Sequence, residues 1–353
     1  MTRRSLIISA VGAALLFVGA GCISVGTNPT AVASDGGIFK SVNKGDTWAQ
    51  KAAIPTTTPD RRSISGVSVA YIAQDPQDSN ALYIGTVENG MFYTYDGGES
   101  WFQSVLNRGR VASIAVHPKD KCIVYATSEF KLLKTEDCSR TWNVAFLDSR
   151  SDKQTKAVAI DSYNPDIIWL ATNSGDLLET LDAGESWASV KNFNDDIYKL
   201  IISPVDTRHV YVATKGNGVW RTQDGGATWT DLSKNYKDFA GTREFSDMVL
   251  APSEPKTLII ASKFGLIRSV DGGDTWSKID LLTPAGSTVI YSLAVDPKDP
   301  NSIYYGTSTT FYRSTNGGVN WVPKKLPTSR TATYLLVDSV NSSALYMGVT
   351  RFK

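Results

Sequence analysis

The stretch Thr222–Trp229 reads Thr-Gln-Asp-Gly-Gly-Ala-Thr-Trp, and close copies of it occur seven times along the chain. Each copy starts with Ser or Thr, has Asp or Asn two residues later and ends in Trp; six of the seven have Gly at the fifth position. The tryptophans are 53, 41, 45, 42, 47 and 45 residues apart. The chain is therefore built from repeats of one supersecondary unit.

The residue types of the repeat suit a tight turn between two strands. The Asp or Asn side chain accepts hydrogen bonds from backbone N–H groups of its own turn, and the Ser or Thr hydroxyl does the same. Glycine supplies a positive φ, and the tryptophan is a large apolar wedge between neighbouring units. The structural positions of the seven copies are Asn43 and Trp48, Asp96 and Trp101, Asp137 and Trp142, Asp182 and Trp187, Asp224 and Trp229, Asp271 and Trp276, and Asn316 and Trp321.

The segments between these turns predict short β-strands. Val111–Val116 is typical of an inner strand buried on both faces, and a second strand ending in Gly-Thr or Ala-Thr follows, as at Gly85-Thr86. Four strands within a period in the forties are typical of a β-propeller blade. We predict an all-β fold over residues 31–353: a single seven-bladed β-propeller of four-stranded antiparallel blades. The turn itself resembles the Asp-box, or BNR, repeat, and the resemblance covers nearly everything after residue 30.

The order of the strands predicts how the ring closes. The first Asp-box has no inner strand before it, and the last inner strand, 332–338, has no Asp-box after it. N- and C-terminal strands therefore share one blade, which removes the open edges of an unclosed sheet. Residues 31–34 and 344–348 both qualify as the second strand of that blade, and the sequence leaves this choice open.

The first residues predict export. Arg3 and Arg4 precede an uncharged, largely apolar stretch that ends near Val18, which is typical of a signal peptide and shorter than the roughly 20 residues of a membrane-spanning helix. Residues 19–22 resemble a bacterial lipobox, in which the cysteine, here Cys22, is lipidated. We predict a signal peptide over 1–21, a linker or anchor over 22–30 and a lipoprotein on the extracytoplasmic side of a membrane. Cleavage after Ala20 and an uncleaved anchor are the alternatives.

The two other cysteines, Cys122 and Cys138, lie on one predicted hairpin of the third blade. A turn near residues 128–130 places Cys122 opposite residues near 136, within reach of Cys138. Because exported proteins keep such bridges, we predict a disulfide. Two free, buried thiols are the alternative.

The composition excludes several classes of function. The chain has 353 residues, 42% of them hydrophobic, and a formal net charge of +1, so it is globular and lacks the overall positive charge of a nucleic-acid-binding protein. Two histidines and three cysteines leave almost nothing from which to build a zinc or iron site. We expect a monomer without metal or cofactor.

The face opposite the Asp-boxes carries the long, variable loops, and binding sites on rigid scaffolds lie in such loops. The predicted binding residues on this face are Arg61, Arg62, Arg108, Arg110, Lys156, Tyr198, Tyr291 and Arg330. A mixed, solvated rim without a ligand is the alternative. Lys199 and Asp247 occupy equivalent inner-strand positions in adjacent blades, which predicts an ion pair in the central channel.

The resemblance to Asp-box proteins implies two kinds of function. Photosystem II assembly factors and sortilin-type receptors are non-catalytic, whereas xyloglucanase-type relatives are hydrolases. We favour an exported, membrane-tethered, non-catalytic propeller that binds a protein or glycan, as an assembly-factor-like scaffold would. The alternative is a glycoside hydrolase or glycan-binding protein of the xyloglucanase-like group, for which the candidate carboxyl groups are Asp195, Asp196, Glu244 and Asp247.

Overall fold

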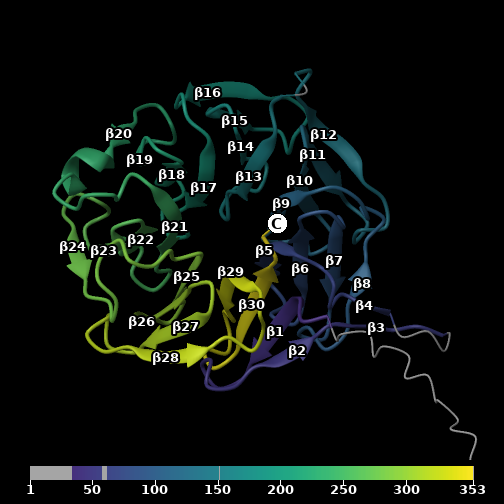
Figure 1. The fold of residues 1–353 in the computed structure, drawn as a ribbon. Helices are drawn as coiled ribbons and strands as arrows, with labels where there is room; N and C mark the ends of the chain where they lie inside the picture. Colours follow the sequence, from purple (N-terminus) through teal and green to yellow (C-terminus); the bar gives the residue numbers. More distant parts are fainter. Residues whose placement is uncertain (1–33, 58–61, 151, 353) are drawn as a thin grey trace, which may run out of the picture. The chain divides into compact units, whose positions relative to one another are not determined.

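The structure is a computed structural model that describes residues 34–57, 62–150 and 152–352. The strands of this part of the chain form seven four-stranded antiparallel sheets, set as blades around a central axis (Figure 1), and one additional two-stranded hairpin. The predicted all-β, seven-bladed propeller is confirmed. The predicted signal peptide, the linker and Cys22 lie outside the described residues, as does Arg61.

Each blade runs from an inner strand near the axis to an outer strand at the rim. The inner strands are β5 (Val69–Gln74), β9 (Val111–Val116), β13 (Thr155–Ile160), β17 (Ile197–Ile202), β21 (Phe245–Leu250), β25 (Ser292–Asp296) and β29 (Thr331–Val337). The second strands are β6 (Leu82–Thr86), β10 (Val124–Ser128), β14 (Ile168–Thr172), β18 (Val210–Thr214), β22 (Leu258–Ser262), β26 (Asp299–Gly306) and β30 (Leu345–Thr350).

The two remaining strands of each blade flank its Asp-box. The third strands are β1 (Gly37–Ser41), β7 (Met91–Thr94), β11 (Lys131–Thr135), β15 (Asp176–Thr180), β19 (Val219–Thr222), β23 (Gly265–Ser269) and β27 (Thr310–Ser314). The outer strands are β2 (Ala49–Lys51), β8 (Phe102–Gln103), β12 (Asn143–Leu147), β16 (Ala188–Asn192), β20 (Thr230–Asp231), β24 (Ser277–Ile279) and β28 (Val322–Lys325). Outside the blades, β3 (Ala53–Ile54) pairs with β4 (Arg62–Ser63), and a 3-10 helix, η1, spans Leu232–Tyr236.

The second strands hold the core of the blades. All five residues of β14 and of β18 are buried, because both faces of these strands pack against neighbouring blades. This explains why their sequences are continuous apolar runs rather than alternating patterns.

The ring closes in a blade with the strand order β2-β1-β30-β29. The N-terminal strand β1 pairs antiparallel with β30, with Ile38 opposite Gly348. Of the two segments that the sequence left open, the C-terminal one therefore supplies the second strand. Its six residues are all buried, as are those of the second strands β6, β14, β18 and β22.

The Asp-box turns contain the predicted hydrogen bonds. In the fifth blade, Asp224 Oδ1 accepts from the Thr228 backbone N–H at 2.9 Å, and Thr222 Oγ1 accepts from the Gly226 N–H at 2.9 Å. The equivalent pair of bonds is present in the other six turns. Hydrogen bonds from the hydroxyl and backbone of Thr228, with that from Thr222, lower the pKa of Asp224 to about 2.

The Asp-box tryptophans connect neighbouring blades. Trp101 is fully buried, and its indole N–H donates to the Lys51 carbonyl of the preceding blade at 2.9 Å. Trp187 donates in the same way to the Ala145 carbonyl at 2.8 Å. Each of these rings therefore packs as an apolar wedge between blades with its polar end satisfied.

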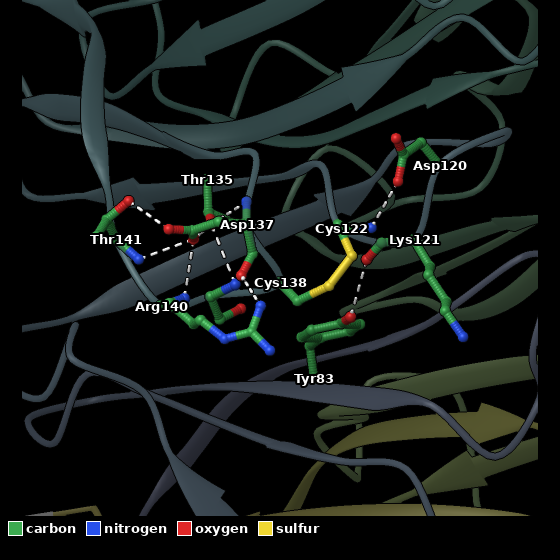
Figure 2. Close-up of a disulfide and its surroundings, with 10 residues drawn as sticks. Tyr83, Asp120, Lys121, Cys122, Thr135, Asp137, Cys138, Arg140 and Thr141 are labelled. Atoms are coloured by element: carbon green, nitrogen blue, oxygen red, sulfur yellow. Dashed lines mark hydrogen bonds between the residues drawn. A yellow bond between two sulfur atoms is a disulfide. The ribbon is translucent and has the colours of Figure 1, made fainter.

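A disulfide joins Cys122, in the turn between β9 and β10, to Cys138, in the third Asp-box (Figure 2). It links two turns at the same end of one blade. These two turns share an end because successive antiparallel strands alternate in direction. We call this end of the propeller the Asp-box face and the opposite end the loop face.

Candidate functional site

A cavity of about 280 Å³ opens at the loop face of the central channel. Its lining comes from the beginnings of the inner strands, which the chain enters from the loop face. Four of the predicted binding residues line it, namely Arg110, Lys156, Tyr198 and Tyr291. Aromatic rings and three cations, Arg110, Lys156 and Lys199, therefore meet in one concave site.

An ion pair between two adjacent blades forms part of the lining of this cavity. Lys199 on β17 donates to Asp247 Oδ1 on β21 at 2.8 Å, so the predicted pair is confirmed. Backbone N–H groups of Met248 and Leu293 also bind the Asp247 carboxylate, at 2.8 and 3.1 Å. Burial acts to lower the pKa of Lys199, but the charge of Asp247 outweighs it and the pKa is raised. Lys199 therefore stays protonated.

Two tyrosines lie beside this ion pair, and the sequence analysis did not predict them as residues of the site. The rings of Tyr71 and Tyr334 lie 4.9 Å apart, and the Lys199 ammonium lies 5.7 Å from the centre of the Tyr334 ring. Counted back from the turn after each inner strand, both tyrosines have the same register position as Lys199 and Asp247. That register was the signal that would have found them.

A second cavity, of about 230 Å³, lies toward the Asp-box face. It is lined by the ends of inner strands and shares Lys199, Asp247 and Tyr334 with the first cavity. These three side chains therefore separate the two ends of the channel. A ligand entering from the loop face meets a charged, aromatic floor rather than an open tunnel.

The other two cations of the loop-face cavity, Lys156 and Arg110, differ in their surroundings. The Lys156 ammonium lies 3.7 Å from Asp196 Oδ2. Burial raises the pKa of Asp196, although Lys156 and Lys215 act in the opposite direction. Arg110 is exposed, and no carboxylate within the described ranges forms an ion pair with it. Arg110 is therefore the cation of this cavity that is most open to an anionic partner.

Arg62 and Arg108 are exposed at the rim but are not among the residues that line the cavity. Tyr198 is 42% exposed, and the ring of Tyr291 packs against Phe352 at a centroid distance of 5.5 Å. The aromatic part of the predicted surface is thus accessible, and the C-terminal Phe352 extends it.

The structure contradicts the prediction that Arg330 is a binding residue. Its side chain is buried, and its guanidinium donates to the Val67 carbonyl at 3.0 Å and to the Gly66 carbonyl at 3.2 Å. Its Nε also lies 3.5 Å from Asp35 Oδ1. Arg330 therefore joins the last blade to the N-terminal segment and offers no charge to a partner.

The four carboxyl groups considered for a hydrolase have internal partners. Asp195 Oδ2 accepts from the Asn217 backbone N–H at 2.8 Å, and Glu244 pairs with Lys263 at 2.8 Å. Asp247 and Asp196 face Lys199 and Lys156. Burial raises the pKa of Asp196, as a general acid requires.

No group of three or more His, Cys, Asp or Glu side chains in the described part of the chain could hold a metal ion. Within the same residues, no helix is long and apolar enough to cross a bilayer.

Comparisons with known proteins show that this chain is similar to two groups of proteins. The family model described as Photosynthesis system II assembly factor YCF48 matches residues 110–236. The xyloglucanase Xgh74A of Acetivibrio thermocellus is 26% identical over 218 residues, which cover 48% of this chain and 26% of the relative. A xyloglucanase of a Paenibacillus species is 24% identical over 218 residues, covering 48% of this chain and 21% of the relative. The match thus spans about a quarter of these relatives' length.

Solved structures show the same two groups. A structure of YCF48 bound to D1 peptide has a TM-score of 0.64 and 18% identity, covering 86% of this chain and 98% of that one. The GH74 xyloglucanase from Xanthomonas campestris has a TM-score of 0.65 and 16% identity, covering 80% of this chain and 51% of that one. At such identities the likeness shows the fold. Repeats and fold agree: this chain is a seven-bladed β-propeller whose turns resemble the Asp-box (BNR) repeat and whose fold is similar to those of YCF48 and the GH74 xyloglucanases.

Proposed function

We propose that this protein is a non-catalytic, assembly-factor-like propeller that binds an acidic segment of a partner protein in the loop-face cavity. In this proposal it is exported and tethered outside the cytoplasm through Cys22, as the N-terminal sequence predicts. The observation that carries the binding role is the cavity of about 280 Å³, where the exposed Arg110 lies among aromatic side chains.

The chemistry of the cavity supports an acidic peptide. Arg110 can form charge-assisted, bidentate hydrogen bonds with a carboxylate. Tyr198 and Tyr291 supply apolar surface with polar ends, which suits peptide binding. A YCF48 structure of the same fold holds a D1 peptide, which supports a peptide as ligand for this chain.

The ion pairs and hydrogen bonds of the candidate carboxyl groups support a role without catalysis. A glycoside hydrolase needs one carboxylic acid and one carboxylate on either side of the scissile bond. Here Asp247 and Glu244 are ion-paired and Asp195 caps a turn. The alternative, a glycan-binding protein or hydrolase, is favoured by the matches to xyloglucanases, and it would use Asp196 as its acid.

The test measures binding of fluorescently labelled acidic peptides to the full-length protein by anisotropy. Charge reversal of Arg62 and Arg110 together should abolish binding without changing the melting temperature. Lys256→Glu is the matched control, because Lys256 is exposed on the Asp-box face. Binding that survives the double reversal would refute the loop-face site.

A parallel assay follows release of reducing ends from xyloglucan and other polysaccharides. Release by the wild type that is lost in Asp196→Ala would establish the hydrolase instead. Asp195→Ala serves as the control for loss of a neighbouring carboxyl group.

A further inference from the structure

Three of the junctions between blades share an ion-pair arrangement on the Asp-box face. Arg221, just before the fifth Asp-box, donates to the Gly272 carbonyl of the next blade at 2.8 Å and to the Asp274 carboxylate at 2.9 Å. Gly272 and Asp274 are the fourth and sixth residues of their Asp-box. The same arrangement is formed by Lys40 with Gly97 and Glu99, and by Arg313 with Lys44 and Asp46.

The junction between the second and third blades departs from this pattern at both charged positions. Tyr93 stands where the cation stands at those three junctions, and Arg140 stands in place of the acidic residue. The fourth position is Cys138, which is in the disulfide with Cys122 (Figure 2). The ion pair between blades is therefore replaced by an aromatic ring on one side and a cation on the other.

A cavity of about 280 Å³ lies at this junction, lined by Tyr93, Tyr95, Lys121, Cys138 and Arg140. It belongs to the Asp-box face, because Tyr95 and Arg140 are Asp-box residues and Lys121 lies in the turn between β9 and β10. It is therefore separate from the loop-face cavity and from the proposed function.

Aromatic rings form one wall of this junction cavity. Tyr93 stacks on Phe102 with centroids 5.8 Å apart, and Tyr95 lies 5.4 Å from Tyr93. Tyr95 and Phe102 are 42% and 41% exposed. Exposed rings of this kind offer flat apolar surface together with a hydroxyl, which matches the apolar face and hydroxyl edge of a sugar ring.

The other wall carries positive charge without an acidic partner. Arg140 and Lys121 are both exposed, and within the described segments neither forms an ion pair. The Arg140 guanidinium donates only to the Asp137 backbone carbonyl, at 3.0 Å. The nearby Asp120 and Asp137 carboxylates accept hydrogen bonds from their own turns instead. This wall is therefore complementary to an anion.

We propose that the cavity between the second and third blades binds an acidic saccharide, with a pyranose ring against Tyr95 and Tyr93 and its carboxylate paired with Arg140 and Lys121. The volume fits one ring-sized group, since it is near the lower end of ligand pockets, about 300 Å³. The disulfide links the two turns that carry Lys121 and Arg140, so these turns are held together before binding.

The experiment is calorimetric titration of the full-length, oxidised protein with trigalacturonate and with its methyl ester. The acid should bind, and the ester should bind at least about tenfold more weakly because it lacks the charge. Tyr95→Ala and Arg140→Gln should each raise the Kd for the acid about tenfold or more. Both side chains are exposed, so the melting temperatures should stay unchanged.

The matched controls come from the sixth blade, where Val270 occupies the Asp-box position of Tyr95 and Lys256 is an exposed cation on the same face as Lys121. Val270→Ala and Lys256→Gln should leave the Kd unchanged. Arg110→Glu, at the loop face, should also leave it unchanged, which separates this site from the proposed function. Absence of trigalacturonate binding, or equal losses in Lys256→Gln and Arg140→Gln, would overturn the proposal. Acidic peptides that bind here in place of the saccharide would overturn it as well.

Discussion

Replacing Ser139 by glycine should stabilise the protein, because the other six Asp-boxes have glycine at this position. The φ angle of Ser139 is +68°, and a left-handed conformation costs an L-residue about 1 to 2 kcal/mol. Its hydroxyl is buried and has no hydrogen-bond partner in the described part of the chain, which costs about 1 to 3 kcal/mol. Glycine removes both costs.

The gain is reduced because glycine gives the unfolded chain more freedom, at a cost of about 0.5 to 1 kcal/mol. We therefore expect Ser139→Gly to raise the free energy of unfolding by about 2 kcal/mol. The measurement is urea unfolding followed by tryptophan fluorescence, under oxidising conditions that preserve the Cys122–Cys138 disulfide.

The control is the reverse substitution at the equivalent position of the second blade, Gly98→Ser. Gly98 has a φ of +88°, and the nearest atoms to an added Cβ are 3.5 Å away, so a serine fits without a clash. This variant should lose stability by an amount similar to the gain from Ser139→Gly. If Ser139→Gly has no effect or destabilises the protein while Gly98→Ser destabilises it, the reasoning about Ser139 is refuted.

Three further predictions concern the charged groups. Arg330→Ala should lower the free energy of unfolding by about 3 kcal/mol, since it leaves the Gly66 carbonyl without its side-chain donors and removes the buried cation beside the Asp35 carboxylate; a loss in urea unfolding of well under this size would contradict it. Lys199→Met should destabilise by about 3 kcal/mol because the Asp247 charge stays buried, and Lys199→Met with Asp247→Leu should recover most of that loss in a double-mutant cycle. The pKa of Asp224 is lowered from 3.8 to about 2, so its contribution to stability is present above pH 4 and is lost as the pH falls toward 2. Asp224→Asn should therefore flatten the fall in melting temperature over this range, and an unchanged pH profile would count against the prediction.

Several features of the site were predictable because the repeat sets a register. Once the Asp-boxes place every strand, equivalent residues in different blades point to the same part of the channel. The Lys199–Asp247 pair was predicted in this way and confirmed at 2.8 Å. Tyr71 and Tyr334 lie in the same register and were missed because only charged residues were compared.

Arg330 could not be assigned correctly from its own neighbourhood. An arginine in a loop is usually exposed, but the partners of Arg330 are Asp35, Gly66 and Val67, more than 260 residues earlier in the chain. Ring closure brings them together. Exposure of a side chain depends on what the rest of the chain places over it, and local sequence does not contain that information.

The sequence by itself determined the number of blades and the turn of each, because an Asp-box is a local structure in which all hydrogen-bond partners lie within about one turn of the chain. The tertiary structure decided which terminal strand closes the ring, which cations remain free and where cavities form. The junction at Tyr93 and Arg140 illustrates the reason. Each residue is unremarkable in its own repeat, and only the contact between two blades shows that an ion pair is missing there and that a cavity takes its place.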